Sequence, residues 1–264
     1  MKTKRSIIMV ILMVVVLMAP LMAQAARDLG GSGDAAKGPV VEYVPIANGP
    51  IGLLAGGKHY EINPAKTAMF IIDPQKVYSD STSPLYCEKY TAALNNIDRL
   101  AAAAKAKGIK VFLIKHVYYS DGNGGYTNCG RICDFGVQGL WGDDNVWSRL
   151  DVPESILNNA DFYAEKSIYS SFTKPVANTL KHLDVDTVIV SGFMSEFCSV
   201  TATRHGHDLG FKMIYVKDAN DGPALLESLS GIDENAAVPF WMSIPVADVY
   251  NTTDELVNVI DLLN

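Results

Sequence analysis

The sequence predicts an α/β fold, a three-layer α/β/α arrangement with a mostly parallel, doubly wound sheet. Short apolar runs at residues 68–72, 111–114, 188–190 and 213–216 alternate with segments of helical character. Uninterrupted apolar runs are typical of strands buried on both faces, as in parallel sheets. The alternation of strands with helices indicates crossover connections, with helices covering both faces.

The helical segments are recognised by their spacing and their ends. Residues 88–107 carry apolar or small side chains at helical spacing, and Gly108 ends the segment. Residues 175–183 begin with a proline, which suits the first turn of a helix. Residues 246–250 predict a fifth strand, and residues 254–263 a final helix.

The N-terminal region predicts an exported protein. Basic residues precede an apolar run, and Ala23-Gln24-Ala25 provides an A-x-A site, so residues 1–25 are typical of a cleavable signal peptide. The alternative is an uncleaved membrane anchor, for which the apolar run is at the short limit. We expect residues 26–60 to form an N-terminal extension and residues 61–264 to form one domain, in the periplasm or secreted.

The charge and the cysteine content of the sequence argue against several classes of function. The formal net charge is −7, and no basic cluster follows residue 5, so nucleic-acid binding is disfavoured, and no membrane contact is expected after cleavage. One disulfide among Cys87, Cys129 and Cys133 is compatible with export. A zinc site lacks the required partner spacing, and Cys129-x3-Cys133 is not the C-x-x-C of thiol redox proteins.

The residues that follow each predicted strand are the candidates for a site, because ligands bind at the carboxyl ends of parallel strands. They are Asp73, residues 115–116, residues 191–198 and residues 217–221. Residues 118–150 form a long, Gly-rich segment with two tryptophans. Loops of this length inside a compact domain are usually lids or binding loops.

Cys198 lies where a buried strand passes into a helix. Gly192 allows a sharp turn, Ser195 is placed to cap, and a helix is expected from about Glu196 to Leu209. Free N–H groups in the first turn, together with a cationic neighbour, would lower the pKa of Cys198 and hold an oxyanion. The alternative is a buried structural cysteine.

Two further residues are weak candidates when taken alone. Asp73 is also compatible with a turn or helix-capping aspartate. Lys166 precedes a cluster of serine and aromatic residues at 167–172, which indicates a buried loop rather than an open surface.

Three segments together resemble the isochorismatase-like hydrolases, a family that includes nicotinamidases and N-carbamoylsarcosine amidases. They are Ile-Ile-Asp-Pro-Gln at 71–75, Lys-Ser-Ile-Tyr-Ser-Ser-Phe at 166–172 and Gly-Phe-Met-Ser-Glu-Phe-Cys at 192–198. Similarity continues at 201–204, 208–211, 217–219 and 252–255, so the resemblance covers about residues 65–262. Each motif is weak alone, and the ordered set is fairly specific.

The resemblance implies roles for particular residues. Asp73 would be the general base, Lys166 its charged partner and Cys198 the nucleophile. A cis peptide between Phe193 and Met194 would direct the N–H groups of Met194 and Cys198 at the substrate carbonyl oxygen. A small-molecule substrate, no cofactor and a homo-oligomer are also expected. We further expect substrate contacts from Gln75, His116, Tyr169 and Phe197, although for His116 a structural polar residue at a strand end is the safer interpretation.

The sequence also departs from its relatives. No Asp-x-His follows residues 115–118, which disfavours a metal-dependent nicotinamidase, and no metal is expected. Ile168 occupies the position where isochorismatases often carry arginine. We therefore expect cleavage of a C–N bond in a small amide or ureido substrate through a Cys198 thioester. The alternatives are a vinyl-ether hydrolase, which would not need Cys198, and a non-catalytic binding protein, in which Cys198 would not react with iodoacetamide at neutral pH.

Overall fold

The computed structural model describes residues 59–127, 129–223, 231–243 and 246–263. The expected signal peptide and nearly all of the expected extension lie outside these residues. Within the described ranges, no helix is both long and apolar enough to cross a membrane.

Six strands form one sheet in the order β3-β2-β1-β4-β5-β6. All neighbouring strands are parallel. The fold class predicted from the sequence is therefore confirmed. The strands are β1 (Thr67–Ile72), β2 (Lys110–His116), β3 (Phe162–Lys166), β4 (Thr187–Phe193), β5 (Lys212–Asp221) and β6 (Ala247–Tyr250).

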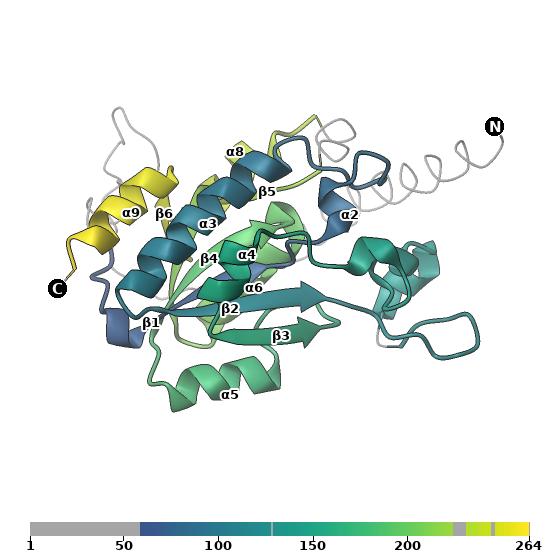
Figure 1. Ribbon diagram of the computed structural model, residues 1–264, viewed down its shortest axis with the longest axis horizontal. Coiled ribbons are helices and arrows are strands. Elements are labelled where there is room, and N and C mark those ends of the chain that lie inside the picture. The colour runs from purple at the N-terminus through teal and green to yellow at the C-terminus, as the bar shows by residue number, and fades with distance from the viewer. Residues whose placement is uncertain (1–58, 128, 224–230, 244–245, 264) are drawn as a thin grey trace, which may run out of the picture. The chain divides into compact units, whose positions relative to one another are not determined.

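Helices cover both faces of the sheet. Figure 1 shows α3 and α9 side by side across one face, and α4 packs beside α3. Helices α5, α6 and α8 contribute buried side chains to the core on the other face. The helices are α2 (Lys76–Ser79), α3 (Tyr90–Ala106), α4 (Glu154–Asn159), α5 (Lys174–His182), α6 (Val200–Asp208), α8 (Glu234–Ser243) and α9 (Thr253–Asp261), with a short 3-10 turn, η1 (Pro64–Lys66).

Alternation along the strands separates two apolar cores. On β1, Met69 and Ile71 pack with residues of α3 and α9, whereas Phe70 and Ile72 pack with residues of α5 and α6. All four side chains are fully buried. Because successive side chains point to opposite faces, a strand that serves two cores must be apolar throughout.

Strand β3 corrects one expectation. Lys166 was expected in a loop, but it is the last residue of this edge strand. Along β3, exposed and less exposed side chains alternate, and Tyr163 is 55% exposed. A strand at the sheet edge therefore lacks the continuous apolar run that identifies the interior strands.

The segment from 118 to 150 is more ordered than a simple loop. It contains the short helices η2 (Gly130–Phe135), η3 (Gln138–Trp141) and η4 (Val146–Ser148). A disulfide joins Cys129 to Cys133, while Cys87 is free and buried. Isolated bridges connect Gln75 to Leu150 and Tyr118 to Gly142, so the segment is attached near the carboxyl ends of β1 and β2.

Candidate active site

The strand order reverses between β1 and β4. Connections after β1 run toward β2 and β3, and those after β4 run toward β5 and β6. In open α/β sheets, such a switch point leaves a crevice beyond the carboxyl ends of the two central strands. The residues that directly follow β1 and β4 are therefore the first place to look for a site.

Asp73 directly follows β1 in an uncommon backbone conformation. Its φ is +50°, a left-handed value that a non-glycine residue seldom adopts. Its backbone N–H donates to the Ile114 carbonyl oxygen at 2.8 Å, which holds the chain against β2. Its side chain is fully buried. Such outliers cluster at functional sites, so the turn at Asp73 is consistent with a functional carboxylate.

Gly192 allows β4 to approach β1 at this point. The two strands pair Ile72 with Gly192, whose φ is +130°. A β-carbon at position 192 would overlap the backbone of Ile72. Only glycine therefore fits both the conformation and the space. The next peptide bond, between Phe193 and Met194, is cis.

Cys198 lies in the first turns of the helix after β4. Residues Ser195–Ser199 form a wide helical turn, η5, which continues into α6. The Met194 carbonyl accepts from the N–H groups of Phe197 and Ser199 at 3.2 and 3.1 Å. Ser195 does not cap the helix as expected, because its hydroxyl donates to the Glu196 carboxylate at 2.9 Å.

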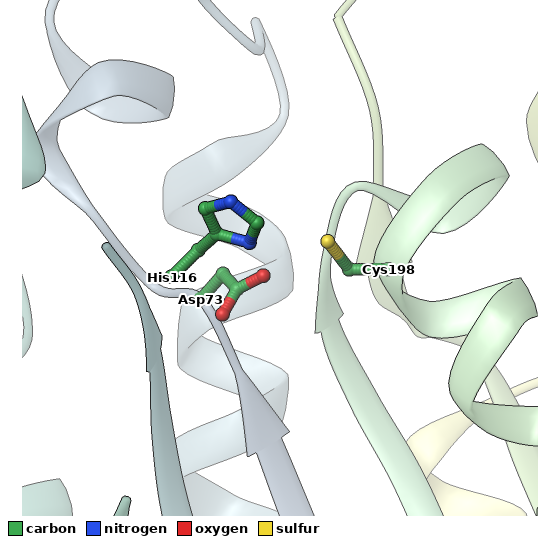
Figure 2. A group of neighbouring side chains, drawn as sticks. All are labelled: Asp73, His116 and Cys198. Atoms are coloured by element: carbon green, nitrogen blue, oxygen red, sulfur yellow. The ribbon is translucent and has the colours of Figure 1, made fainter. Parts of the chain in front are cut away.

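Lys166 reaches the site from β3. The register of β2 and β3 pairs His116 with Lys166, so both side chains stand at the carboxyl edge of the sheet. Lys166 Nζ lies 2.7 Å from Asp73 Oδ2 and 3.2 Å from Cys198 Sγ. It also lies 3.1 Å from His116 Nδ1 and 3.2 Å from the Ile168 carbonyl oxygen. Figure 2 shows Asp73 and His116 facing Cys198 across the switch point.

The charges of Asp73 and Lys166 are buried together and stabilise one another. Both side chains are 0% exposed. Burial raises the pKa of Asp73, and the Lys166 ammonium offsets only part of that rise. Burial opposes the charge of Lys166, but Asp73 and Cys198 outweigh it and raise its pKa. Lys166 therefore stays protonated at neutral pH, and Asp73 is a carboxylate prone to take up a proton.

The structure corrects the expected acidity of Cys198. Burial raises the pKa of its thiol, and the attraction of Lys166 offsets this only partly while Asp73 adds to it. The helix start and its cationic neighbour do not lower the pKa below the ordinary value. The resting group is therefore a thiol, whose proton must leave as the sulfur reacts. Asp73 Oδ1 is buried and has no hydrogen-bond partner within the described ranges, so it is free to take that proton.

Gln75 does not occupy the substrate-binding place expected for it. Its side-chain amide donates to the carbonyl oxygens of His116 and Ser148 at 2.9 and 2.7 Å, and its carbonyl accepts from the His116 N–H at 2.9 Å. The side chain is fully buried. All these contacts are to backbone groups, so Gln75 holds the end of β2 and the 118–150 segment in place.

The aromatic residues near the site divide into core and surface. Phe193 is fully buried, with its ring stacked on those of Tyr78 and Tyr90 at centroid distances of 5.8 and 4.5 Å. Tyr169 is 36% exposed, and its ring contacts that of Phe197 at 5.6 Å. Phe193 is thus a core residue, whereas Tyr169 and Phe197 extend from the site toward the surface.

Sequence reasoning missed two contacts of the site. The Ile168 carbonyl accepts from Lys166, and Trp141 packs against the His116 ring at 5.7 Å. A backbone carbonyl has no signature in the sequence. Trp141 was noted only as part of a long segment, whose fold over His116 is a tertiary feature. His205 pairs with the Ser170 hydroxyl at 2.8 Å.

Three groups of the site have the chemistry of metal ligands. Ligand atoms of Asp73, His116 and Cys198 lie within 4.8 Å of one another. Lys166 Nζ contacts all three groups. An ammonium ion therefore already provides positive charge where a metal would bind, and these residues do not fit a resident metal ion.

A doubly wound sheet with Asp73, Lys166 and Cys198 meeting at its switch point is the arrangement of an isochorismatase-like cysteine hydrolase. The Isochorismatase domain family matches residues 67–233, and the chain belongs to this family.

Comparisons with individual proteins agree with this assignment. Nicotinamidase 3 of Arabidopsis thaliana is 25% identical over 160 residues, which are 58% of this chain and 71% of the relative. A cysteine hydrolase from Pseudomonas syringae pv. phaseolicola superposes with a TM-score of 0.65 and 25% identity, covering 77% of this chain and 96% of that one. A pyrazinamidase/nicotinamidase from Streptococcus mutans shares the fold, with a TM-score of 0.55, 17% identity and coverage of 70% and 99%.

Proposed function

We propose that the protein is an exported amidase that cleaves the C–N bond of a small amide or ureido substrate through a thioester on Cys198. One observation carries the proposal: Lys166 Nζ contacts both Asp73 Oδ2, at 2.7 Å, and Cys198 Sγ, at 3.2 Å, in a buried cluster. A base, a cation and a nucleophile within reach of one another are what covalent catalysis of acyl transfer requires.

The first half of the reaction forms the thioester. Asp73 takes the thiol proton while Cys198 Sγ attacks the carbonyl carbon, and the carbonyl electrons move onto its oxygen. The N–H groups of Met194 and Cys198 hold that oxyanion. Lys166 stabilises the negative charge that passes between carboxylate and sulfur. When the tetrahedral intermediate collapses, the C–N bond breaks and protonated Asp73 gives its proton to the leaving amine.

The second half releases the acid. Asp73, again a carboxylate, removes a proton from a water molecule that attacks the thioester carbonyl. The C–S bond then breaks, and Cys198 recovers its proton from Asp73. The raised pKa values of Asp73 and Cys198 suit this cycle, because both groups must hold the shuttled proton in turn.

The proposal that the enzyme is exported rests on the sequence of residues 1–25. The Cys129–Cys133 disulfide supports it, since such bonds persist mainly in oxidising compartments.

Two variants test the proposed chemistry on a panel of acetamide, benzamide, the three pyridinecarboxamides and N-carbamoylglycine. We expect Cys198→Ala and Asp73→Asn each to lower kcat by about 1000-fold or more, since both act in the bond-breaking steps. Circular dichroism and urea unfolding check that the variants fold. Isochorismate tests the alternative chemistry: turnover that survives Cys198→Ala but not Asp73→Asn would replace the amidase proposal with vinyl-ether hydrolysis.

A further inference from the structure

His116 is held in one orientation at the end of β2. Its backbone N–H and carbonyl are both hydrogen-bonded to the Gln75 side chain at 2.9 Å. Its ring meets the rings of Tyr118 and Trp141 edge to face, at 4.7 and 5.7 Å. The residue is 3% exposed. A ring fixed by a backbone clamp and two aromatic neighbours has little freedom to turn.

The contact with Lys166 determines which ring nitrogen carries the proton. An ammonium has only donors, so His116 Nδ1, at 3.1 Å from Lys166 Nζ, must accept. Burial and the charge of Lys166 lower the pKa of His116 well below its ordinary value, so the ring is neutral. A neutral ring that accepts at Nδ1 carries its hydrogen on Nε2.

The Nε2–H group has no hydrogen-bond partner among the residues that the structure describes. Figure 2 shows one ring nitrogen directed at the space between Asp73 and Cys198, and the other directed away from Asp73. Nε2 is not one of the fully buried side-chain atoms that lack a partner, so this donor is within reach of solvent or of a ligand.

The ammonium of Lys166 has more neighbouring acceptor atoms than hydrogens to donate. Its three N–H groups are shared among Asp73 Oδ2, Cys198 Sγ, His116 Nδ1 and the Ile168 carbonyl. Removing His116 Nδ1 would leave three acceptors for three hydrogens, and Cys198 Sγ would then receive a hydrogen bond more of the time. His116 thus limits how strongly Lys166 can draw the proton off Cys198.

We propose that His116 is a two-sided positioning residue, whose Nδ1 holds the Lys166 ammonium between Asp73 and Cys198 and whose Nε2–H binds an acceptor atom of the substrate. This inference rests on the proposed amidase function and deepens it. The substrate would carry, near the amide that is cleaved, a second oxygen or nitrogen atom with a free lone pair.

Three variants separate the two sides of the ring. His116→Asn keeps an acceptor near the Nδ1 position and removes the distal donor. His116→Gln keeps an amide donor near Nε2 and removes the proximal acceptor. His116→Phe keeps the ring volume and removes both. All are assayed for kcat and KM on the amide of the panel that the wild-type protein turns over fastest.

We expect His116→Asn to raise KM about 10-fold with kcat within about threefold, the size of one lost hydrogen bond. We expect His116→Gln to lower kcat with KM nearly unchanged, and His116→Phe to change both. If His116→Asn and His116→Gln changed kcat and KM in the same proportion as His116→Phe, or if none of the three changed either constant, the two-sided role would be wrong.

Alkylation of Cys198 gives a readout that needs no turnover. At pH 9, we expect iodoacetamide to modify Cys198 at least about threefold faster in His116→Phe than in the wild type, which corresponds to a pKa of Cys198 lower by about half a unit. In His116→Asn we expect the wild-type rate. Equal rates in all three proteins would overturn the Lys166 contact. The amidase proposal fails separately, if the wild-type protein hydrolyses no amide of the panel or Cys198→Ala retains full activity.

Discussion

At the scale of single residues, the site depends on how one ammonium is shared. Lys166 is the last residue of β3, and its Nζ contacts a carboxylate, a thiol, an imidazole nitrogen and a carbonyl oxygen. An isolated buried charge is costly, so each charged group here depends on its partner. The positions of Asp73 and Cys198 are therefore linked through Lys166 although the three residues are far apart in the chain.

Lys166→Met is expected to destabilise the fold as well as to stop the reaction. It leaves the fully buried Asp73 carboxyl without its 2.7 Å partner, so the free energy of unfolding should fall by roughly 3–5 kcal/mol at pH 7. The pKa of Asp73 should rise further. Because a group with a raised folded-state pKa favours folding only below that pKa, the loss should shrink as the pH is lowered toward 4. Urea unfolding at several pH values measures this.

The matched control is the double variant Asp73→Asn/Lys166→Met, which removes both charges. It should recover part of the lost free energy of unfolding, because no unpaired charge remains buried. A double variant that is less stable than Lys166→Met by the full cost of a second independent substitution would show that the two side chains do not form a pair.

Cys198 should react slowly with iodoacetamide at neutral pH in the folded protein. Its pKa is raised by burial, so the thiolate fraction, and with it the alkylation rate, should grow as the pH rises beyond 9. In Lys166→Met the rate should be lower at every pH, since Lys166 favours the thiolate. Peptide mass spectrometry separates Cys198 from the buried Cys87. Slow alkylation at neutral pH therefore does not mark a non-catalytic protein, contrary to our expectation from the sequence.

At the scale of secondary-structure elements, strand register brings the site together. The pairing of His116 with Lys166 sets β3 beside β2, and the pairing of Ile72 with Gly192 sets β4 beside β1. Side chains that follow these strands consequently meet at one edge of the sheet. A shift of one residue in either pairing would turn the side chains to the opposite face.

Gly192→Ala is expected to disrupt this assembly. The new β-carbon would overlap the Ile72 backbone, and alanine is also strained at φ +130°. We expect the free energy of unfolding to fall by more than about 3 kcal/mol and kcat to fall sharply. Gly210→Ala is the control, because Gly210 has φ +90° but no atom within 4 Å of the added carbon, and it should cost only about 1–2 kcal/mol. Equal losses would show that close approach at Gly192 is unimportant.

The elements differ in how far the sequence could predict them. Strands β1, β2, β4 and β5 are apolar because they are buried on both faces, and this pattern can be read directly. Strand β3 was not predicted, because at the edge of the sheet exposed and less exposed side chains alternate along the strand. Helix α8 was not predicted either, because it contains Pro239, and a proline inside a segment argues against a helix.

For the site, the sequence identified the three central residues but not the contacts around them. Three ordered motifs identified Asp73, Lys166 and Cys198, and the structure brings all three together. The contact of Lys166 with His116 depends on the β2–β3 register, and the backbone role of Gln75 depends on the position of the 118–150 segment. The raised pKa of Cys198 reflects burial, which the helix-start pattern could not indicate.

At the scale of the whole molecule, the sheet places the site at its topological switch point. The two apolar cores pack against β1 and β4 from both faces, and the buried polar cluster lies where these strands end. Family membership over residues 67–233 includes all three proposed catalytic residues.

Export is a prediction that rests on the sequence of residues 1–25. When the full-length protein is produced in a bacterium with a general secretory pathway, we expect the mature form to begin at Ala26 and to lie outside the cytoplasm. N-terminal sequencing of the fractionated protein measures this. A form that begins at Met1 and stays with the membrane would instead support an uncleaved anchor.

The most direct test of Cys198 as the nucleophile is intact mass spectrometry of the protein, quenched in acid during turnover of an amide from the panel. We expect a mass increase equal to that of the acyl group, located on the peptide that contains Cys198 and absent from Cys198→Ala. Hydrolysis with no adduct, together with turnover that persists in Cys198→Ala, would contradict the claim that Cys198 is the nucleophile.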